Sequence, residues 1–164
     1  MRKYIYSLVL ELFLIVSLIA LDLLTKNFIY GPIASGQPDI ILIPGVLRFV
    51  AIKNTGASFG IFADYTNILT IVSIISVVGA IVVLILTQKK VSNPLFKIAM
   101  SLIIAGGIGN IIDRVKFGYV RDFVYLEIID FAVFNVADSC LTIGCILIII
   151  YVLWDFFSTT KKEK

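Results

Sequence analysis

Four long apolar segments dominate this sequence, and they limit what the chain can fold into. They cover residues 4–24, 68–86, 95–112 and 136–157, and each is close to the length of about 20 residues at which a helix crosses a bilayer. Hydrophobic residues make up 60% of the 164 residues and charged residues only 15%, too apolar a mixture for a soluble domain of this length. The sequence therefore predicts a mainly α-helical membrane protein built as a four-transmembrane-helix bundle.

The polar segments between these helices predict the rest of a single domain over residues 1–164. Extracytoplasmic loops are expected near residues 25–67 and 113–135. Within them, VLRFVAIKN (46–54) and FVYLEII (123–129) are rich in the β-branched and aromatic residues typical of strands. We therefore expect a small β-sheet on the outer end of the bundle, with its apolar side available to lipid or to an apolar substrate.

Lysine and arginine predict the orientation of the helices, because short cytoplasmic loops are enriched in these residues. Basic residues crowd two helix ends, in QKK (88–90) and TTKKEK (159–164). This pattern predicts that both termini are cytoplasmic. Most of the acidic residues then fall at the outer ends of the helices, so the functional face is expected to be extracytoplasmic.

The sequence has no histidine, which removes histidine general bases, Ser-His and Cys-His nucleophile pairs and imidazole metal sites. Cys140 and Cys145 are five residues apart, and a helix turns through about 140° over that distance, so they do not share a face. We interpret both as small core residues and predict neither a metal site nor a cofactor. The net charge of +3, spread over scattered basic residues, argues against nucleic acid as a partner.

Five short polar stretches fall at the outer side of the predicted bundle. They are DLLTK (22–26), NTGASFG (54–60), GGIGNIIDR (106–114), VRDF (120–123) and FNVAD (134–138). Asp22 and Lys26 are four residues apart and are interpreted as a structural polar pair on one helix face. The glycines of the third stretch let neighbouring helices approach closely. Asn110, Asp113 and Arg114 either form a polar network at a helix end or contact a substrate.

Asp138 and Asp122 have different local settings. If Asn135 is the N-cap of the last helix, Asp138 is its third residue and completes a capping box, so that capping competes with catalysis as its role. Asp122 lies between Arg121 and a strand-like run, with no helix start to explain it. Two carboxylates that share a proton can activate water and protonate an amide. The helix N-terminus favours an ionised Asp138, which would leave the proton on Asp122.

In this order, the five stretches resemble the signature blocks of the lipoprotein signal peptidases (signal peptidase II), a family of bacterial membrane aspartyl peptidases. The resemblance implies that Asp122 and Asp138 are the catalytic pair. It also implies a set of residues that bind substrate or support the site, namely Asn54, Gly56, Asn110, Asp113, Arg114 and Asn135. The sequence departs from the family at Ala132 and Val133, where a proline is expected before FNVAD.

The resemblance further implies a prolipoprotein substrate whose lipobox cysteine carries diacylglycerol, cleaved on the N-terminal side of that cysteine. The implied partners are these signal peptides and membrane phospholipid. The implied setting is the bacterial cytoplasmic membrane, with the protein acting as a monomer and the active site toward the extracytoplasmic face.

Two other functions compete with this interpretation. A small proton- or ion-coupled transporter would use acids near the membrane midplane, whereas the acids here lie at outer helix ends and no internal repeat is evident. Glu11 is the exception to that pattern. A non-catalytic membrane scaffold would use the outer polar cluster only to hold helix ends together.

Overall fold

The computed structural model describes residues 2–56 and 66–160, so the last part of NTGASFG lies outside the described residues. Within the described part of the chain, four helices are long and apolar enough to cross a membrane. They lie within Tyr4–Ala34, Thr66–Thr87, Pro94–Phe117 and Val136–Ser158. The mainly helical fold predicted from the sequence is therefore confirmed.

The helices extend beyond the ends predicted from hydropathy. Helix α1 (Arg2–Thr25) runs without a break into a π-helical turn, η1 (Lys26–Tyr30), and then α2 (Gly31–Ala34). Helix α4 (Pro94–Phe117) continues five residues past the predicted end at residue 112. Hydropathy falls at Lys26 and Asp113, but these side chains are buried and paired with each other, so the helical backbone continues.

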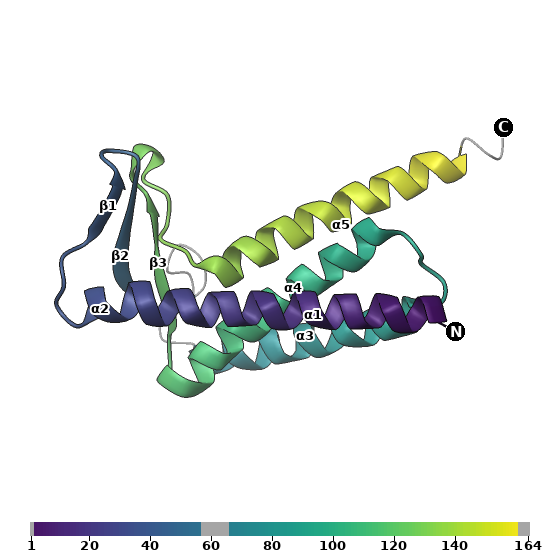
Figure 1. The fold of residues 1–164 in the computed structure, drawn as a ribbon, viewed down its shortest axis with the longest axis horizontal. Coiled ribbons are helices and arrows are strands. Elements are labelled where there is room, and N and C mark those ends of the chain that lie inside the picture. The colour runs from purple at the N-terminus through teal and green to yellow at the C-terminus, as the bar shows by residue number, and fades with distance from the viewer. Residues whose placement is uncertain (1, 57–65, 161–164) are drawn as a thin grey trace.

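Helices α3 (Thr66–Thr87) and α5 (Val136–Thr160) complete the bundle. Figure 1 shows that α1 begins and α5 ends at the end of the bundle opposite the sheet. In the same view α5 starts close to the sheet and then leans away from the other helices. The start of α5, which follows FNVAD's first two residues, therefore lies near the sheet.

Three antiparallel strands form a sheet in the described part of the chain, in the order β1 (Ile40–Ile43), β2 (Leu47–Asn54), β3 (Val120–Leu126). Strand β2 matches the predicted strand closely. Strand β3 begins three residues before the predicted 123–129, and Glu127–Ile129 forms a 3₁₀ turn, η3, instead. Figure 1 shows the sheet lying across one end of the bundle.

A bulge in β2 sets which side chains meet beside β3. Phe49 pairs with Val124 but Ile52 pairs with Asp122, so β2 holds one more residue than β3 over this interval. Asn54 then lies opposite Val120. Alternate residues of a strand share a face, so Asn54 is on the same face of the sheet as Asp122.

Phe134 extends the pairing on the other edge of β3. Its N–H donates to the carbonyl of Val124 at 3.0 Å, and the Val124 N–H donates back at 2.8 Å. Residue 135 follows immediately and precedes the first residue of α5. The bridge therefore holds the start of α5 against the strand that carries Asp122.

Glycines set the separation between α4 and its neighbours. A Cβ atom on Gly106 would lie 2.4 Å from the carbonyl oxygen of Ala137 in α5, and one on Gly109 would lie 2.6 Å from Oδ2 of Asp22 in α1. Real Cβ atoms do not make such contacts, so only glycine permits the helices to lie this close. The predicted role of these glycines in helix packing is confirmed.

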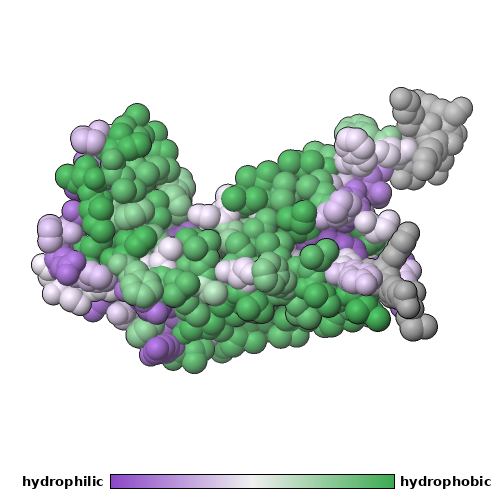
Figure 2. Space-filling model, in the orientation of Figure 1, coloured by the Kyte–Doolittle hydropathy of each residue, from purple (hydrophilic) through white to green (hydrophobic). Residues whose placement is uncertain are grey.

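The buried apolar core lies between α1, α3 and α4 and includes Ile15, Val77, Leu84, Phe96, Met100 and Ile104. The outer faces of the helices are apolar, as Figure 2 shows by its continuous hydrophobic surface, and this suits contact with lipid. Cys140 is buried as predicted, whereas Cys145 is exposed. The prediction of a core position for Cys145 is therefore wrong, because it faces away from α4 along the exposed side of α5.

Glu11 belongs to a polar cluster at the end of the bundle opposite the sheet. Its carboxylate lies 3.4 Å from Nζ of Lys97 in α4 and accepts hydrogen bonds from Ser7 and Gln88. Lys97 also donates to Ser7 and Gln88. Glu11, which lies far from the outer helix ends, thus joins α1 to Lys97 of α4 and to Gln88.

Candidate active site

The start of α5 carries a capping box that orients Asp138. Oδ1 of Asn135 accepts a hydrogen bond from the Asp138 N–H at 2.8 Å, and Oδ2 of Asp138 accepts one from the Asn135 N–H at 3.3 Å. Oδ1 of Asp22 accepts from the Ala137 N–H at 3.0 Å. These bonds satisfy N–H groups that have no partner inside the helix. The capping role expected for Asn135 and Asp138 is confirmed.

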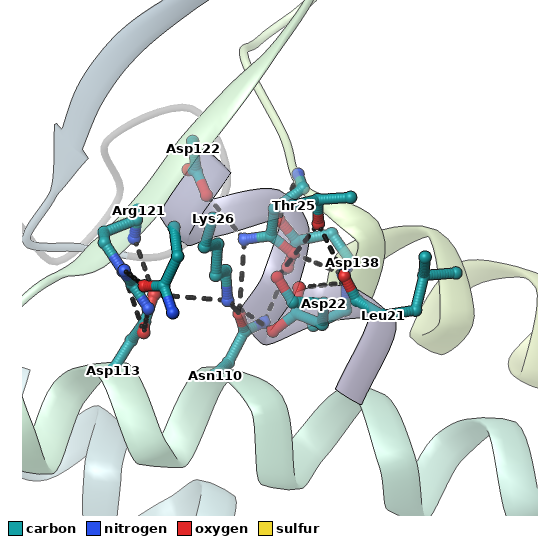
Figure 3. Close-up of polar contacts among 12 residues, drawn as sticks. Leu21, Asp22, Thr25, Lys26, Asn110, Asp113, Arg121, Asp122 and Asp138 are labelled. Atoms are coloured by element: carbon teal, nitrogen blue, oxygen red, sulfur yellow. Dashed lines mark hydrogen bonds and ion pairs between the residues drawn. The ribbon is translucent and has the colours of Figure 1, made fainter. Parts of the chain in front are cut away.

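The side chain of Asn135 also reaches the other aspartate. Its Nδ2 donates to Oδ1 of Asp122 at 2.6 Å, while Nδ2 of Asn54 donates to Oδ2 of Asp122 at 2.9 Å. Asp122 is only 1% exposed. Asn135 therefore bonds to both aspartates, and Figure 3 shows Asp122 and Asp138 on opposite sides of the same polar cluster.

Asn110 of α4 supports Asp138 from the opposite side. Its Nδ2 donates to Oδ1 of Asp138 at 2.7 Å. Its Oδ1 accepts hydrogen bonds from Nδ2 of Asn135 at 3.2 Å and from Nζ of Lys26 at 3.3 Å. The two catalytic candidates are thus connected through the amide side chains of Asn110 and Asn135, which come from segments far apart in the sequence.

A chain of buried charges lies beneath these amides. Nζ of Lys26 lies 2.8 Å from Asp22 and 3.2 Å from Asp113, and Asp113 forms a 2.8 Å ion pair with Arg121. All four side chains are buried, and buried charges persist when each has a partner. The polar pair predicted for Asp22 and Lys26 is present, but it belongs to a larger network that Figure 3 displays around Lys26.

Burial and charge set the protonation of Asp122. Its removal from water raises the pKa of Asp122 from the ordinary value of 3.8 to about 7, and the nearby charge of Asp138 acts in the same direction. Hydrogen bonds from Asn54 and Asn135 and the charge of Lys26 oppose this increase. Asp122 can therefore carry a proton near neutral pH, as an acid in catalysis must.

A cavity of about 590 Å³ opens above the aspartates, between the sheet and the starts of α3 and α5. Figure 2 shows it as the notch between the sheet and α5. Asp138, Asn54, Asn110 and Arg114 line its polar part. The remaining wall is mainly apolar and includes Leu69, Leu126, Phe131, Leu141 and Ile143. The cavity thus combines a small polar floor with walls suited to an apolar ligand.

Arg114 lines this cavity and contacts Gly56. Nη2 of Arg114 donates to the carbonyl oxygen of Gly56 at 3.3 Å, and its guanidinium interacts electrostatically with Asp138 and Asp122. Its Nε is buried and forms no hydrogen bond within the described residues. Arg114 thus offers positive charge close to the two carboxylates.

The structure brings the predicted site residues together at one end of the bundle. Asp113 does not line the cavity and instead contacts Lys26 and Arg121. The sequence reasoning missed Arg121, whose backbone and side chain both donate to Asp113. Gly118, at φ 78°, ends α4 and reverses the chain there, and a glycine at a helix end is the signal that could have indicated this return. Within residues 2–56 and 66–160, no three Cys, Asp or Glu side chains are grouped to hold a metal ion.

The chain is similar to known proteins over almost its whole length. Residues 14–154 match the family model described as signal peptidase (SPase) II. A lipoprotein signal peptidase from Streptococcus pyogenes serotype M3 (strain MGAS315) is 40% identical over 153 residues, which are 93% of each chain. The corresponding protein from serotype M5 (strain Manfredo) is 39% identical over the same share.

Solved structures share the fold as well. A bacterial membrane enzyme determined by the in meso method at 2.3 Å resolution is 36% identical, with a TM-score of 0.77 over 94% of this chain and 92% of that chain. A second, determined at 1.9 Å, is 35% identical with a TM-score of 0.72 over 87% of this chain and 92% of that chain. The fold and the site therefore define a multi-pass membrane enzyme. The chain belongs to the signal peptidase II family, which consists of proteases, and neither a transporter nor a scaffold is favoured.

Proposed function

We propose that this protein removes the signal peptide from diacylglyceryl-modified prolipoproteins, cutting on the N-terminal side of the lipidated cysteine, with Asp122 and Asp138 as its catalytic pair. One observation carries the proposal. The two carboxylates, from β3 and α5, are both bonded to Asn135, and Asp138 lies at the polar floor of a mainly apolar cavity. The names of the relatives support the substrate class.

The pair divides the chemistry of amide hydrolysis. Ionised Asp138 takes a proton from a water molecule, whose oxygen attacks the scissile carbonyl carbon while Asp122 gives its proton to the carbonyl oxygen. When the tetrahedral intermediate collapses, the C–N bond breaks and the leaving amine takes up the proton held by Asp138. The hydroxyl proton of the intermediate returns to Asp122, which restores the starting state of the pair.

The cavity suits the substrate in two ways. Its apolar wall, which includes Leu69 of α3 and Leu141 of α5, would accept acyl chains and the apolar signal helix. Its polar floor would bind the peptide backbone around the scissile bond through Asn54 and Arg114, and Gly56 would support Arg114 through its carbonyl oxygen. We also propose that the enzyme acts as a monomer and that the exposed apolar side chains of its helices contact phospholipid.

We further propose that the protein lies in the bacterial cytoplasmic membrane with both termini in the cytoplasm. The basic residues at the end of α3 support this orientation, which puts the aspartates near the extracytoplasmic surface. Labelling intact cells with a membrane-impermeant thiol reagent would test it. In a cysteine-free background Gln37→Cys should react and Lys89→Cys should not, and the reverse result would contradict the orientation.

Cleavage of a defined substrate tests the catalytic assignment. Purified protein in detergent is given a diacylglyceryl-modified prolipoprotein, the same precursor without the lipid, and a chelator in parallel reactions. We expect cleavage of the lipidated precursor alone, unchanged by the chelator, and none by Asp122→Asn or Asp138→Asn. Near-parent cleavage by either variant would show that the two carboxylates are not the catalytic pair.

A further inference from the structure

The two aspartates differ in what donates hydrogen bonds to them, and the structure traces this difference to a buried lysine. We propose that Lys26 is a positioning residue that acts through Asn110 to keep Asp138 ionised, leaving the shared proton on Asp122. The proposal rests on the proposed aspartyl peptidase function and adds to it an assignment of which aspartate is the base and which is the acid.

Asn110 has one orientation that suits all of its neighbours. Its Oδ1 faces two donors, Nζ of Lys26 at 3.3 Å and Nδ2 of Asn135 at 3.2 Å. An ammonium group can only donate, so it must face the oxygen of the amide. The nitrogen of Asn110 is then turned toward Asp138, to which it donates at 2.7 Å. A fixed N–H donor stabilises the ionised form of the carboxylate that accepts from it.

Lys26 contacts two acids in its buried position. Its side chain is fully buried, between Asp22 at 2.8 Å and Asp113 at 3.2 Å. The π-helical turn begins at Lys26, and such turns are frequent at functional sites. Lys26 therefore donates to the oxygen of Asn110, and the nitrogen of the same amide donates to Asp138.

Asp122 receives weaker support for its ionised form. Its donors are the amides of Asn54 and Asn135, and neither of these amides bonds to a lysine or arginine among the described residues. Asp138 instead receives the Asn110 amide, whose oxygen bonds Lys26, and the Asn135 N–H at the start of α5.

Several charged or titratable groups act on the pair besides Lys26. Arg114 of α4 interacts with both carboxylates, and the two carboxylates interact with each other. Within α5, Cys140 interacts with Asp138 and with Asp22 of α1. The charge of Arg114 acts on both carboxylates, so it does not determine which of the two is ionised. The charge of Lys26 also acts on Asp122, but the side-chain N–H of Asn110 donates to Asp138, whereas Asn110 is connected to Asp122 only through Asn135.

A charge-balanced double variant tests the role of Lys26 with the lipidated prolipoprotein as substrate. Asp22→Asn/Lys26→Met removes both charges of a buried ion pair, and the amide introduced by the first substitution keeps an oxygen for the Ala137 N–H. The acid limb of the pH dependence of kcat/KM reports ionisation of the base, and we expect it to move to higher pH by about one unit. Glu11→Gln/Lys97→Met, which removes an ion pair at the other end of the bundle, should leave that limb in place.

The outcomes separate this inference from the proposed function. If the parent cleaves and the double variant has a lower rate but an unmoved acid limb, Lys26 is only structural and the inference fails. If the parent protein does not cleave the lipidated prolipoprotein, the proposed function itself is wrong. A shift of equal size in the Glu11→Gln/Lys97→Met control would also overturn the specific role of Lys26.

Infrared spectroscopy gives a second test that needs neither substrate nor a folded lysine variant. The spectra are recorded at a pH of about 5.5, which lies between the pKa of Asp122 in the folded protein and its pKa in the unfolded chain. The parent should then show the C=O band of a protonated carboxyl group. This band should disappear in Asp122→Asn and persist in Asp138→Asn. A band that is lost only in Asp138→Asn would place the proton on the other aspartate and refute the assignment. Isotope-edited difference spectra against the parent would separate this band from those of other buried carboxyl groups.

Discussion

Asn135 and Asp122 are joined by a hydrogen bond of 2.6 Å between Nδ2 and Oδ1. Asn135 is also the N-cap of the helix that carries Asp138. Asn135 thus orients Asp122 through its side-chain nitrogen. It orients Asp138 through its side-chain oxygen and its backbone N–H. The geometry of the pair depends on this residue more directly than on contact between the two carboxylates.

Asn135→Ala is expected to lower activity far more than stability. Loss of the cap should cost about 1 kcal/mol of folding free energy, whereas loss of the bond to Asp122 should reduce kcat by about 100-fold or more. Asn93 provides a matched control, because its side chain caps α4 by accepting from the Leu95 N–H at 2.9 Å. Asn93→Ala should lose similar stability and keep its kcat, and equal losses of kcat in both variants would contradict the prediction.

Stability should depend on pH through Asp122. Burial raises the pKa of Asp122 to about 7 in the folded protein, above its ordinary value of 3.8. The folded state therefore binds more protons between these values, and the stabilisation of the protonated form is lost as the pH rises through about 7. Thermal unfolding of the parent should thus shift to lower temperature between about pH 5 and about pH 8 relative to Asp122→Asn. A difference between the two proteins that stays constant over this range would contradict the prediction.

Asn54 should set the upper end of the active pH range. Its hydrogen bond to Asp122 favours the ionised form and lowers the pKa of that carboxyl. Asn54→Ala should therefore move the alkaline limb of the activity profile to higher pH, by about half a unit to one unit, while lowering the maximal rate. Asn27→Ala removes an amide that accepts from Arg121 and should leave the limb unchanged. A move to lower pH in Asn54→Ala would be the opposite of what this geometry predicts.

Gly109→Ala should separate α4 from α1 and α5. The added methyl group would lie 2.6 Å from Oδ2 of Asp22 and 3.1 Å from Cβ of Ala137, so thermal stability and cleavage should both decrease. Gly79 in α3 has nothing within 4 Å of the corresponding position among the described residues. Gly79→Ala should be neutral or more stable, since alanine favours a helix over glycine by about 1 kcal/mol. Equal effects of the two substitutions on the unfolding temperature would argue against close packing at Gly109.

The sequence predicted the parts of the fold that depend on local composition. Hydropathy and segment length located the helices, and β-branched residues located β2. The ends of α1 and α4 were not predicted, because Lys26 and Asp113 are charged yet lie buried against each other although they are 87 residues apart (113 − 26). Local patterns carry no information about such pairing.

Some features of the candidate site could likewise be predicted from local sequence, whereas others could not. The capping box follows from three-residue spacing, and the absence of histidine left carboxylates as the available acid and base. By contrast, the bond from Lys26 to Asn110 joins positions 84 residues apart, and the position of Asn54 beside Asp122 depends on a bulge in β2. These features arise from the assembled fold, so only a structure reveals them.

The order in which the site residues occur along the chain has a consequence for biosynthesis. Helix α5 supplies Asp138, and the residue just before it supplies the amide that orients Asp122. A nascent chain that ends between Asp122 and Asp138 would hold one aspartate of the proposed pair without its partner, and a shorter chain would hold neither. The protease would therefore gain its activity only when the last of these four helices has been synthesised and inserted, so that neighbouring membrane proteins are not exposed to a half-assembled enzyme.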